Sequence, residues 1–257
     1  MTNSLQNIVI FGGTGFVGSN IAETLWESTS NAKVSCVSRS GTQPIHLHGD
    51  ENAWANSVNW LSCDINANDA LEQVSNIVAG ADAVIIAVGS PPLPTFSKVA
   101  YDKQYRSNGA GNMTILEACA RHKPKHIVII GAAIPAAFRR QRFAYYQGKH
   151  DLIQCAEDLF ANSETQVSIL YPSVIYGRRH TRSGHAVPLG ALRYLAKALQ
   201  CLPHENENST LASVAALAPI SVKTLARSCV SLLMKEAPSE NTNPLHLHNQ
   251  AMLDGHI

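Results

Sequence analysis

Short apolar runs recur along the first two thirds of the chain, and stretches with helical spacing separate them. The first run, residues 8–11, contains no polar position, which is typical of a strand covered on both faces. Runs of the same kind predict further strands at residues 34–37, 58–62, 83–88, 127–130 and 167–170.

The intervening stretches predict helices at residues 16–26, 69–78, 109–121 and 146–160. Strands that alternate with helices in this way favour a parallel sheet with helices on both of its faces. The predicted fold class is therefore α/β, with a doubly wound parallel sheet of the Rossmann type.

The alternation weakens after Tyr176. Helical spacing returns over residues 190–202 and over residues 221–234, where Ser221 is a plausible N-cap, and residues 206–209 form a polar loop. We predict one domain over residues 1–257. Within it, residues 178–257 contribute a small substrate or partner lobe over the carboxyl edge of the sheet, where such folds bind substrate.

The composition argues against several classes of protein. The 20 basic residues nearly cancel the 19 acidic ones, and a net charge of +1 provides no general field to attract nucleic acid or an anionic membrane. No stretch approaches the roughly 18 to 20 apolar residues of a membrane span, and the short polar N-terminus leaves no room for a signal peptide. We expect a cytoplasmic protein, or one of an organellar matrix if a leader was removed.

The cysteine and histidine patterns do not indicate a disulfide framework or a metal site. No two of the six cysteines, at positions 36, 63, 119, 155, 201 and 229, have the spacing of a metal-binding pair, which favours reduced, mostly buried thiols. Two His-x-His segments, at residues 46–48 and 246–248, lack carboxylate or cysteine companions. We therefore predict that no metal is bound.

A glycine-rich loop follows the first strand and opens the first helix. It reads Gly12-Gly13-Thr14-Gly15-Phe16-Val17-Gly18 and satisfies G-x-G-x-x-G from Gly13. The early glycines permit a tight turn and let the backbone approach a pyrophosphate, and Gly18 lets the helix pack close to the strand. The free N–H groups and partial positive charge of the helix N-terminus favour the phosphates of a dinucleotide.

The end of the second strand favours NADP(H) over NAD. NAD-binding proteins usually place an acidic residue there to accept hydrogen bonds from the adenosine ribose. This chain has Ser38, Arg39 and Ser40 instead, and a guanidinium can stack on adenine and pair with a 2′-phosphate. The predicted cofactor is NADP, with NAD as a second possibility.

Two further segments are expected beside the cofactor. Asp64, which precedes Ile65 after the third strand, is placed to accept from the adenine amino group, and a helix-capping role is an equally good interpretation. Ala87, Val88 and Gly89 end the fourth strand, where small residues let a cofactor lie across the sheet.

Together with Asn108, with Tyr145 and Lys149 four residues apart, and with residues 171–177, these features resemble the short-chain dehydrogenase/reductase superfamily in its extended and atypical branches. The resemblance implies that Tyr145 exchanges a proton with the substrate and that Lys149 binds the nicotinamide ribose and lowers the tyrosine pKa. It implies that Asn108 supports the lysine through water.

By the same resemblance, the nicotinamide pocket is lined by Pro172, Ser173, Val174 and Ile175.

One departure from the family affects the expected chemistry. The family's catalytic serine or threonine follows the fifth strand, but residues 130–135 read IGAAIP, with Ala132 and Ala133 at that place. Alanine cannot donate a hydrogen bond to the developing oxyanion, and loss of such a donor costs on the order of a hundredfold in rate.

Arginines cluster just before Tyr145, at positions 139, 140 and 142. They could bind an acidic substrate or partner, but a solvated loop is the favoured interpretation. A sugar-nucleotide substrate requires several anion-binding residues, and the three arginines at positions 178, 179 and 182 keep this substrate class among the alternatives.

Several short segments look similar to one atypical group of the superfamily. The group is the NAD-dependent epimerase/dehydratase-like proteins, which include the mitochondrial ubiquinone-biosynthesis member and relatives of the 39-kDa subunit of respiratory complex I. The similar segments are residues 37–41, Trp54, residues 58–60, residues 64–65 and residues 218–222. Members of this group bind the nucleotide firmly, and several act as structural subunits without known turnover.

Two functions remain in competition. The first is an oxidoreductase or epimerase-like enzyme that acts through Tyr145 and Lys149 on a small carbonyl, quinone-related or sugar-type substrate. The second is an accessory protein of quinone metabolism or of a respiratory complex, with retained nucleotide binding, little turnover and a protein partner. A redox sensor ranks third, and the pattern does not predict an oligomeric state.

Overall fold

Seven parallel strands form the central sheet of the computed structural model, which describes residues 5–29, 32–135, 138–140, 142–181, 183–188, 218–235 and 243–255. The strands lie in the order β11-β6-β5-β4-β1-β2-β3. Their bounds are β1 Asn7–Phe11, β2 Lys33–Ser38, β3 Asn59–Ser62, β4 Ala83–Ile86, β5 His126–Ile130, β6 Gln166–Tyr171 and β11 Leu245–His248. The order reverses between β1 and β4, which creates the crevice at the carboxyl edge where such sheets bind ligands. The predicted doubly wound parallel sheet is confirmed.

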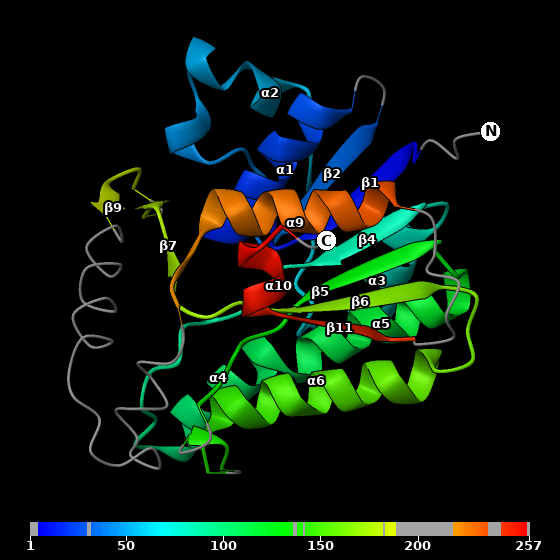
Figure 1. The fold of residues 1–257 in the computed structure, drawn as a ribbon, viewed down its shortest axis with the longest axis vertical. Coiled ribbons are helices and arrows are strands. Elements are labelled where there is room, and N and C mark those ends of the chain that lie inside the picture. Colours follow the sequence, from blue (N-terminus) through cyan, green and yellow to red (C-terminus); the bar gives the residue numbers. More distant parts are fainter. Residues whose placement is uncertain are drawn as a thin grey trace.

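Helices cover both faces of this sheet (Figure 1). On one face, α1 (Phe16–Ser28) packs against α9 (Val222–Met234). On the other face, α5 (Ala110–His122) packs between α3 (Ala70–Val78) and α6 (Ala144–Phe160). Because side chains alternate along a strand, β4 sends Ala83 and Ile85 into the first core and Val84 and Ile86 into the second.

The segment between β2 and β3 packs onto α1 through short helical turns. These are η1 (Ile45–Leu47), η2 (Asp50–Asn52) and α2 (Ala53–Asn56), and Trp54 on α2 is buried in the core on the α1 face. The indole of Trp60 donates to the Ala55 carbonyl at 3.0 Å and fixes α2 against β3.

One helix between β4 and β5 was not predicted from the sequence pattern. Helix α4 (Lys98–Asn108) buries only two side chains, Gln104 and Asn108, and both are polar. It therefore lacks the apolar stripe on which the prediction of amphipathic helices depends. Its N-cap is Ser97, whose Oγ accepts from Ala100 N at 3.2 Å.

The C-terminal part of the chain divides between the sheet and its edge. Short strands β7 (Ile175–Tyr176) and β10 (Ile220–Ser221) pair with each other, β8 (Arg178–His180) pairs with β9 (Ala186–Pro188), and α10 (Asn249–Leu253) follows β11. The predicted lobe of residues 178–257 needs correction in one respect, because β11 extends the main sheet and α9 covers one of its faces. The predicted helix 190–202 and loop 206–209 lie outside the described residues.

The predicted cap at Ser221 is confirmed, since its Oγ accepts from Thr224 N at 2.9 Å. None of the helices in the described ranges has both the length and the apolar character that a membrane crossing requires.

Candidate functional site

The glycine loop turns tightly above β1 and is packed against the ends of β2 and β4. The amides of Gly12 and Gly13 donate to the Val37 carbonyl at 2.9 and 3.3 Å. Gly12 has a φ of 86°, and a Cβ there would lie 2.9 Å from the Ala87 carbonyl. A Cβ on Gly18 would lie 2.3 Å from the Gly12 oxygen, so Gly18 allows close packing of the helix as predicted.

Gly13 and Gly15 differ in what a side chain would meet. A Cβ at Gly13 would lie 2.4 Å from Cys36 Cβ, so this glycine is required for packing against β2. At exposed Gly15, the nearest atom to an added Cβ is the Gly12 oxygen at 3.1 Å. Of these two glycines, Gly15 is the one whose surface is open to a ligand.

The N-terminus of α1 carries no negative group of the protein. Gly15 is the N-cap and offers no side chain, and the first turn contains no acidic residue. The first amides of a helix have no acceptor within the helix, so the N–H groups of Phe16, Val17 and Gly18 and the helix dipole are matched to an external anion. The loop residues therefore fit the pyrophosphate of a dinucleotide.

The end of β2 presents hydroxyl groups and one guanidinium. Ser38 Oγ lies 3.3 Å from Ser40 Oγ and accepts from Gly41 N at 3.2 Å. The Arg39 side chain is exposed and makes no ion pair within the described part of the chain, while its backbone carbonyl accepts from Ser62 Oγ at 3.1 Å. This arrangement leaves the guanidinium free to meet an anion.

Asp64 follows β3 and is exposed, whereas Ile65 is buried. The Oδ1 atom of Asp64 accepts from Asn66 N at 3.1 Å, which closes a turn. Helix α3 begins only after Asp69. The interpretation of Asp64 as a helix cap is therefore wrong, and its role toward adenine stays a prediction.

Asn108 fixes the segment that leaves β4. Its Oδ1 accepts from Ser90 N at 3.2 Å, and its Nδ2 donates to Ser90 Oγ at 2.8 Å and to the Gln104 carbonyl at 2.9 Å. The side chain of Gln104 donates to the Pro91 and Leu93 carbonyls, both at 3.0 Å. The end of α4 thus holds residues 89–93 in place, which the sequence pattern did not indicate.

Lys149 lies buried beside the same segment. Its Nζ donates to the Ile130 carbonyl at 2.7 Å, and a Cβ on Gly89 would lie 3.0 Å from Asn108 Oδ1 and 3.7 Å from Lys149 Nζ. The structure therefore brings Gly89, Asn108 and Lys149 together. Burial lowers the pKa of Lys149 from its ordinary 10.5 to about 8.

Tyr145 precedes Lys149 by one turn of α6. Burial raises the pKa of Tyr145 to about 12, the opposite of the lowering that the family resemblance implies. The phenol is therefore held in its protonated form in the ligand-free protein, and within the described residues its hydroxyl has no hydrogen-bond partner.

The segment after β6 is fixed by backbone contacts. The Pro172 carbonyl accepts from Ala133 N at 2.8 Å, Ser173 N donates to Asn249 Oδ1 at 3.0 Å, and the Val174 carbonyl accepts from Ile220 N at 3.0 Å. Ile175 belongs to β7. Next to it, Gly177 approaches the glycine loop, since a Cβ there would lie 3.1 Å from Phe16 Cζ.

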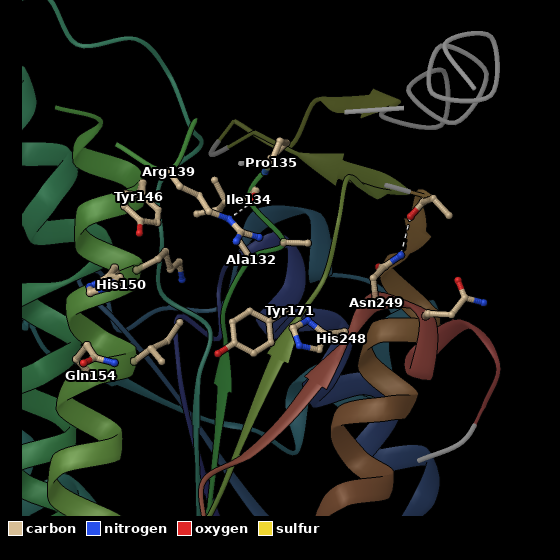
Figure 2. A pocket seen from close by; sticks show the side chains of 15 residues that line it. Ala132, Ile134, Pro135, Arg139, Tyr146, His150, Gln154, Tyr171, His248 and Asn249 are labelled. Atoms are coloured by element: carbon tan, nitrogen blue, oxygen red, sulfur yellow. Dashed lines mark hydrogen bonds between the residues drawn. The ribbon is translucent and has the colours of Figure 1, made fainter. Parts of the chain in front are cut away.

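A pocket of about 670 Å³ opens between α6, the carboxyl ends of β5, β6 and β11, and α10 (Figure 2). Its lining includes Lys149 and the two alanines at the place of the family serine, Ala132 and Ala133. Helix α6 directs Tyr146, rather than Tyr145, into this pocket. The remaining lining residues are Ile134, Pro135, Arg139, His150, Ile153, Gln154, Tyr171, Ala218, His248, Asn249 and Gln250.

The parallel sheet and the glycine loop define a protein of the Rossmann-type α/β class. The model of the NAD dependent epimerase/dehydratase family matches residues 8–210, and the chain belongs to this family.

Two curated proteins are related in sequence. An uncharacterised chloroplastic protein of Arabidopsis thaliana is 27% identical over 187 residues, which are 72% of this chain and 55% of the relative. MIOREX complex component 2 of Saccharomyces cerevisiae is 32% identical over 72 residues, which are 28% of this chain and 25% of the relative. The chain thus spans about half the length of the first relative and a quarter of the second.

Solved epimerase structures share the fold. A UDP-glucuronic acid 4-epimerase of Bacillus cereus, in complex with NAD, superposes with a TM-score of 0.63 at 15% identity, over 95% of this chain and 76% of that one. A UDP-glucose 4-epimerase of Thermotoga maritima superposes with a TM-score of 0.61 at 15% identity, over 95% of this chain and 76% of the other.

Proposed function

We propose that the protein binds NADP(H) and acts as an oxidoreductase of the short-chain dehydrogenase/reductase type. The observation that carries the proposal is the buried ammonium of Lys149 at the carboxyl edge of the sheet. Within the described residues it has one backbone carbonyl as partner and no carboxylate. A buried charge without a counter-charge is costly, which is typical of a functional rather than a structural lysine.

The residues expected to hold the cofactor fit a dinucleotide that extends from α1 to Lys149. The unmatched N-terminus of α1 suits the pyrophosphate, and Arg39 with the neighbouring hydroxyls suits a 2′-phosphate. The close approach of Gly12 to Ala87 places the phosphate loop directly beside the end of β4, which leads on to Gly89 and Lys149. NAD remains the alternative cofactor.

When bound, NADP(H) would provide the hydride chemistry, and the residues of this chain would position the substrate and handle the proton. Tyr145 carries its proton at neutral pH, so this hydroxyl is the proposed proton donor to a reduced carbonyl oxygen, and its pKa of about 12 in the ligand-free protein makes it a weak acid until substrate and cofactor bind. Lys149, with a pKa of about 8, carries a positive charge at neutral pH and stabilises negative charge developing nearby. This charge compensates in part for the hydroxyl that Ala132 and Ala133 lack.

We infer the substrate class from the pocket, which Lys149 lines and Tyr145 does not, rather than from the relatives. The solved neighbours named for UDP-glucuronic acid or UDP-glucose share only about 15% of their residues with this chain. A small carbonyl or quinone-related substrate is compatible with a pocket of about 670 Å³, and a sugar nucleotide is the competing class.

The second candidate function is a nucleotide-binding accessory protein with little or no turnover. The alanines at the position of the family serine favour it, because they leave this segment without a donor side chain. Ala133 contributes only its backbone N–H, which donates to the Pro172 carbonyl at 2.8 Å. A relative in yeast is named as the component of a complex, which also supports this role.

The experiment measures NADPH oxidation by the wild type with a panel of quinones and carbonyls. A separate assay follows conversion of UDP-glucuronic acid to its 4-epimer, because epimerisation causes no net oxidation of the cofactor. Turnover of a quinone or carbonyl that is lost in Tyr145→Phe supports the oxidoreductase. Bound NADPH without turnover of any compound supports the accessory role. Turnover that persists in Tyr145→Phe contradicts the assignment of the proton donor.

A further inference from the structure

The pocket beside Lys149 has an unbalanced charge. Among the described residues, Arg139, Lys149, His150 and His248 are the lining residues that can be cationic, and none of the described lining residues is an aspartate or glutamate. Two carboxylates of α6 pair with histidines: Asp151 Oδ1 lies 3.5 Å from Nδ1 of His150, and Glu157 Oε1 lies 3.4 Å from Nε2 of His246. Neither carboxylate pairs with Arg139 or Lys149, so these two cations of the lining carry the unbalanced charge. A concave site with this lining attracts an anion.

Arg139 is held with its guanidinium at the pocket wall. Its Nε donates to the Ile134 carbonyl at 2.8 Å, and Figure 2 shows the guanidinium close to the wall at Ala132 and Ile134. No ion pair engages Arg139 within the described residues, so both terminal nitrogens remain free to donate. A guanidinium with this freedom binds a carboxylate or a phosphate through two hydrogen bonds.

The rest of the wall is apolar or aromatic. Ala132, Ala133 and Ile134 line it on the side of β5, and Ile153 lines it on α6. Tyr171 stands in the centre of the view in Figure 2, with its ring stacked on that of His248 at a centroid distance of 5.0 Å. The Tyr171 hydroxyl is already engaged by His246 Nδ1 at 2.8 Å, so this residue offers the ligand mainly its ring.

We propose that this pocket binds a small organic anion with a flat apolar body, whose acid group pairs with Arg139 and whose body packs against Tyr171 and the alanine wall. The proposal takes up the alternative in which Arg139 binds an acidic ligand, whereas the solvated loop stays the competing interpretation of this exposed side chain. The proposal rests on the proposed function in one respect, because Lys149 lines this pocket and also belongs to the reaction site. The ligand is then the substrate class of that reaction.

The test compares two flat probes of equal size, 2-naphthoate and its neutral isostere 2-naphthamide, by calorimetric titration of the full chain without nucleotide. Wild type is compared with Arg139→Gln and with the matched control Arg140→Gln, which removes the same charge from the neighbouring residue outside the pocket lining. Inorganic phosphate is added as a competitor to separate a carboxylate site from a phosphate site. Thermal melting of all three proteins establishes that they are folded.

The expected result is that naphthoate binds more tightly than naphthamide, and that Arg139→Gln weakens naphthoate binding by about tenfold or more, as loss of a charge-assisted pair predicts. Arg140→Gln is expected to bind like the wild type. Competition by millimolar phosphate assigns the acid group to a phosphate, and its absence assigns it to a carboxylate.

Equal binding of the two probes, no binding of either, or an equal effect of the two arginine variants overturns the proposal. These results do not depend on NADPH. Failure of nucleotide binding or turnover therefore refutes the proposed function separately.

Discussion

Replacement by alanine is expected to have different effects at two glycines of the phosphate loop. Gly13→Ala is expected to lower the stability of the fold, and Gly15→Ala is expected to lower the affinity for NADPH. The methyl group of Gly13→Ala would lie 2.4 Å from Cys36 Cβ and 2.9 Å from Cys36 Cα, so β2 must move or the loop must open. The methyl group of Gly15→Ala meets only the Gly12 oxygen, at 3.1 Å, and points into the exposed loop where the pyrophosphate is proposed to lie.

The magnitudes follow from these contacts. Overpacking at Gly13 costs about 1–3 kcal/mol of folding free energy, which lowers the melting temperature of a chain of this size by roughly 2–10 °C. Gly15 has a φ of −81°, which an alanine adopts without strain, so Gly15→Ala is expected to melt close to the wild type. Its methyl group keeps the phosphates from the amides of the helix, and NADPH affinity is expected to fall by about tenfold or more.

The assay is thermal melting of the ligand-free proteins followed by calorimetric titration with NADPH. Gly13→Ala is expected to show the larger loss of stability and Gly15→Ala the larger loss of affinity at normal stability. If Gly15→Ala binds NADPH as tightly as the wild type, the reasoning that places the phosphates over this glycine is refuted.

The remaining predictions concern three side chains of the site. Arg39→Asp is expected to shift the preference from NADPH toward NADH by placing an acid near the ribose, and an unchanged ratio of dissociation constants in calorimetry would put Arg39 outside the site. Tyr145→Phe is expected to leave NADPH affinity unchanged and to lower kcat more than Tyr146→Phe, which removes the hydroxyl of the pocket-lining tyrosine; the reverse order would move the proton donor to Tyr146. Lys149→Met is expected to weaken NADPH binding and yet stabilise the ligand-free fold at pH 7 by about 1–2 kcal/mol, because it removes a buried charge at the expense of one hydrogen bond. The folded-state pKa of Lys149, about 8, is below the ordinary 10.5, so between these two pH values the unfolded chain binds one more proton than the folded chain. The free energy of unfolding of the wild type therefore increases as the pH rises through this range. In melting experiments, the stability advantage of Lys149→Met is expected to disappear by about pH 10.5.

Within the described residues, the elements predicted from apolar periodicity were confirmed with small shifts of their ends. The strand predicted at residues 83–88 ends at Ile86, and the helix predicted at residues 146–160 begins at Ala144. The strands are buried on both faces and the helices along one stripe, so the apolar positions in the sequence coincide with the buried positions in the fold.

Several elements were not predicted from such a pattern, among them helix α4 and strand β11. Helix α4 buries only polar side chains, which hold the segment after β4 by hydrogen bonds. In edge strand β11, leucines alternate with histidines, and the histidines stack on Tyr171, a partner far away in the sequence. Interactions of this kind form only in the folded chain.

For the site, the spacing of Tyr145 and Lys149 indicated which turn of helix would carry the chemistry, but not which side chains would share a pocket. The placement of Gly89 beside Asn108 and Lys149, and of Arg139 beside Ala132 and Ile134, depends on loops that meet at the carboxyl edge. The direction of the Tyr145 pKa also depends on burial, which spacing alone does not reveal.

The most direct test of nucleotide binding is a calorimetric titration of the wild-type protein with NADPH and with NADH under identical conditions. Saturable binding with a lower dissociation constant for NADPH is predicted, because Arg39 and the serines beside it take the place of an acidic residue at the end of β2. If neither nucleotide binds, the central claim that this glycine loop holds a dinucleotide is contradicted.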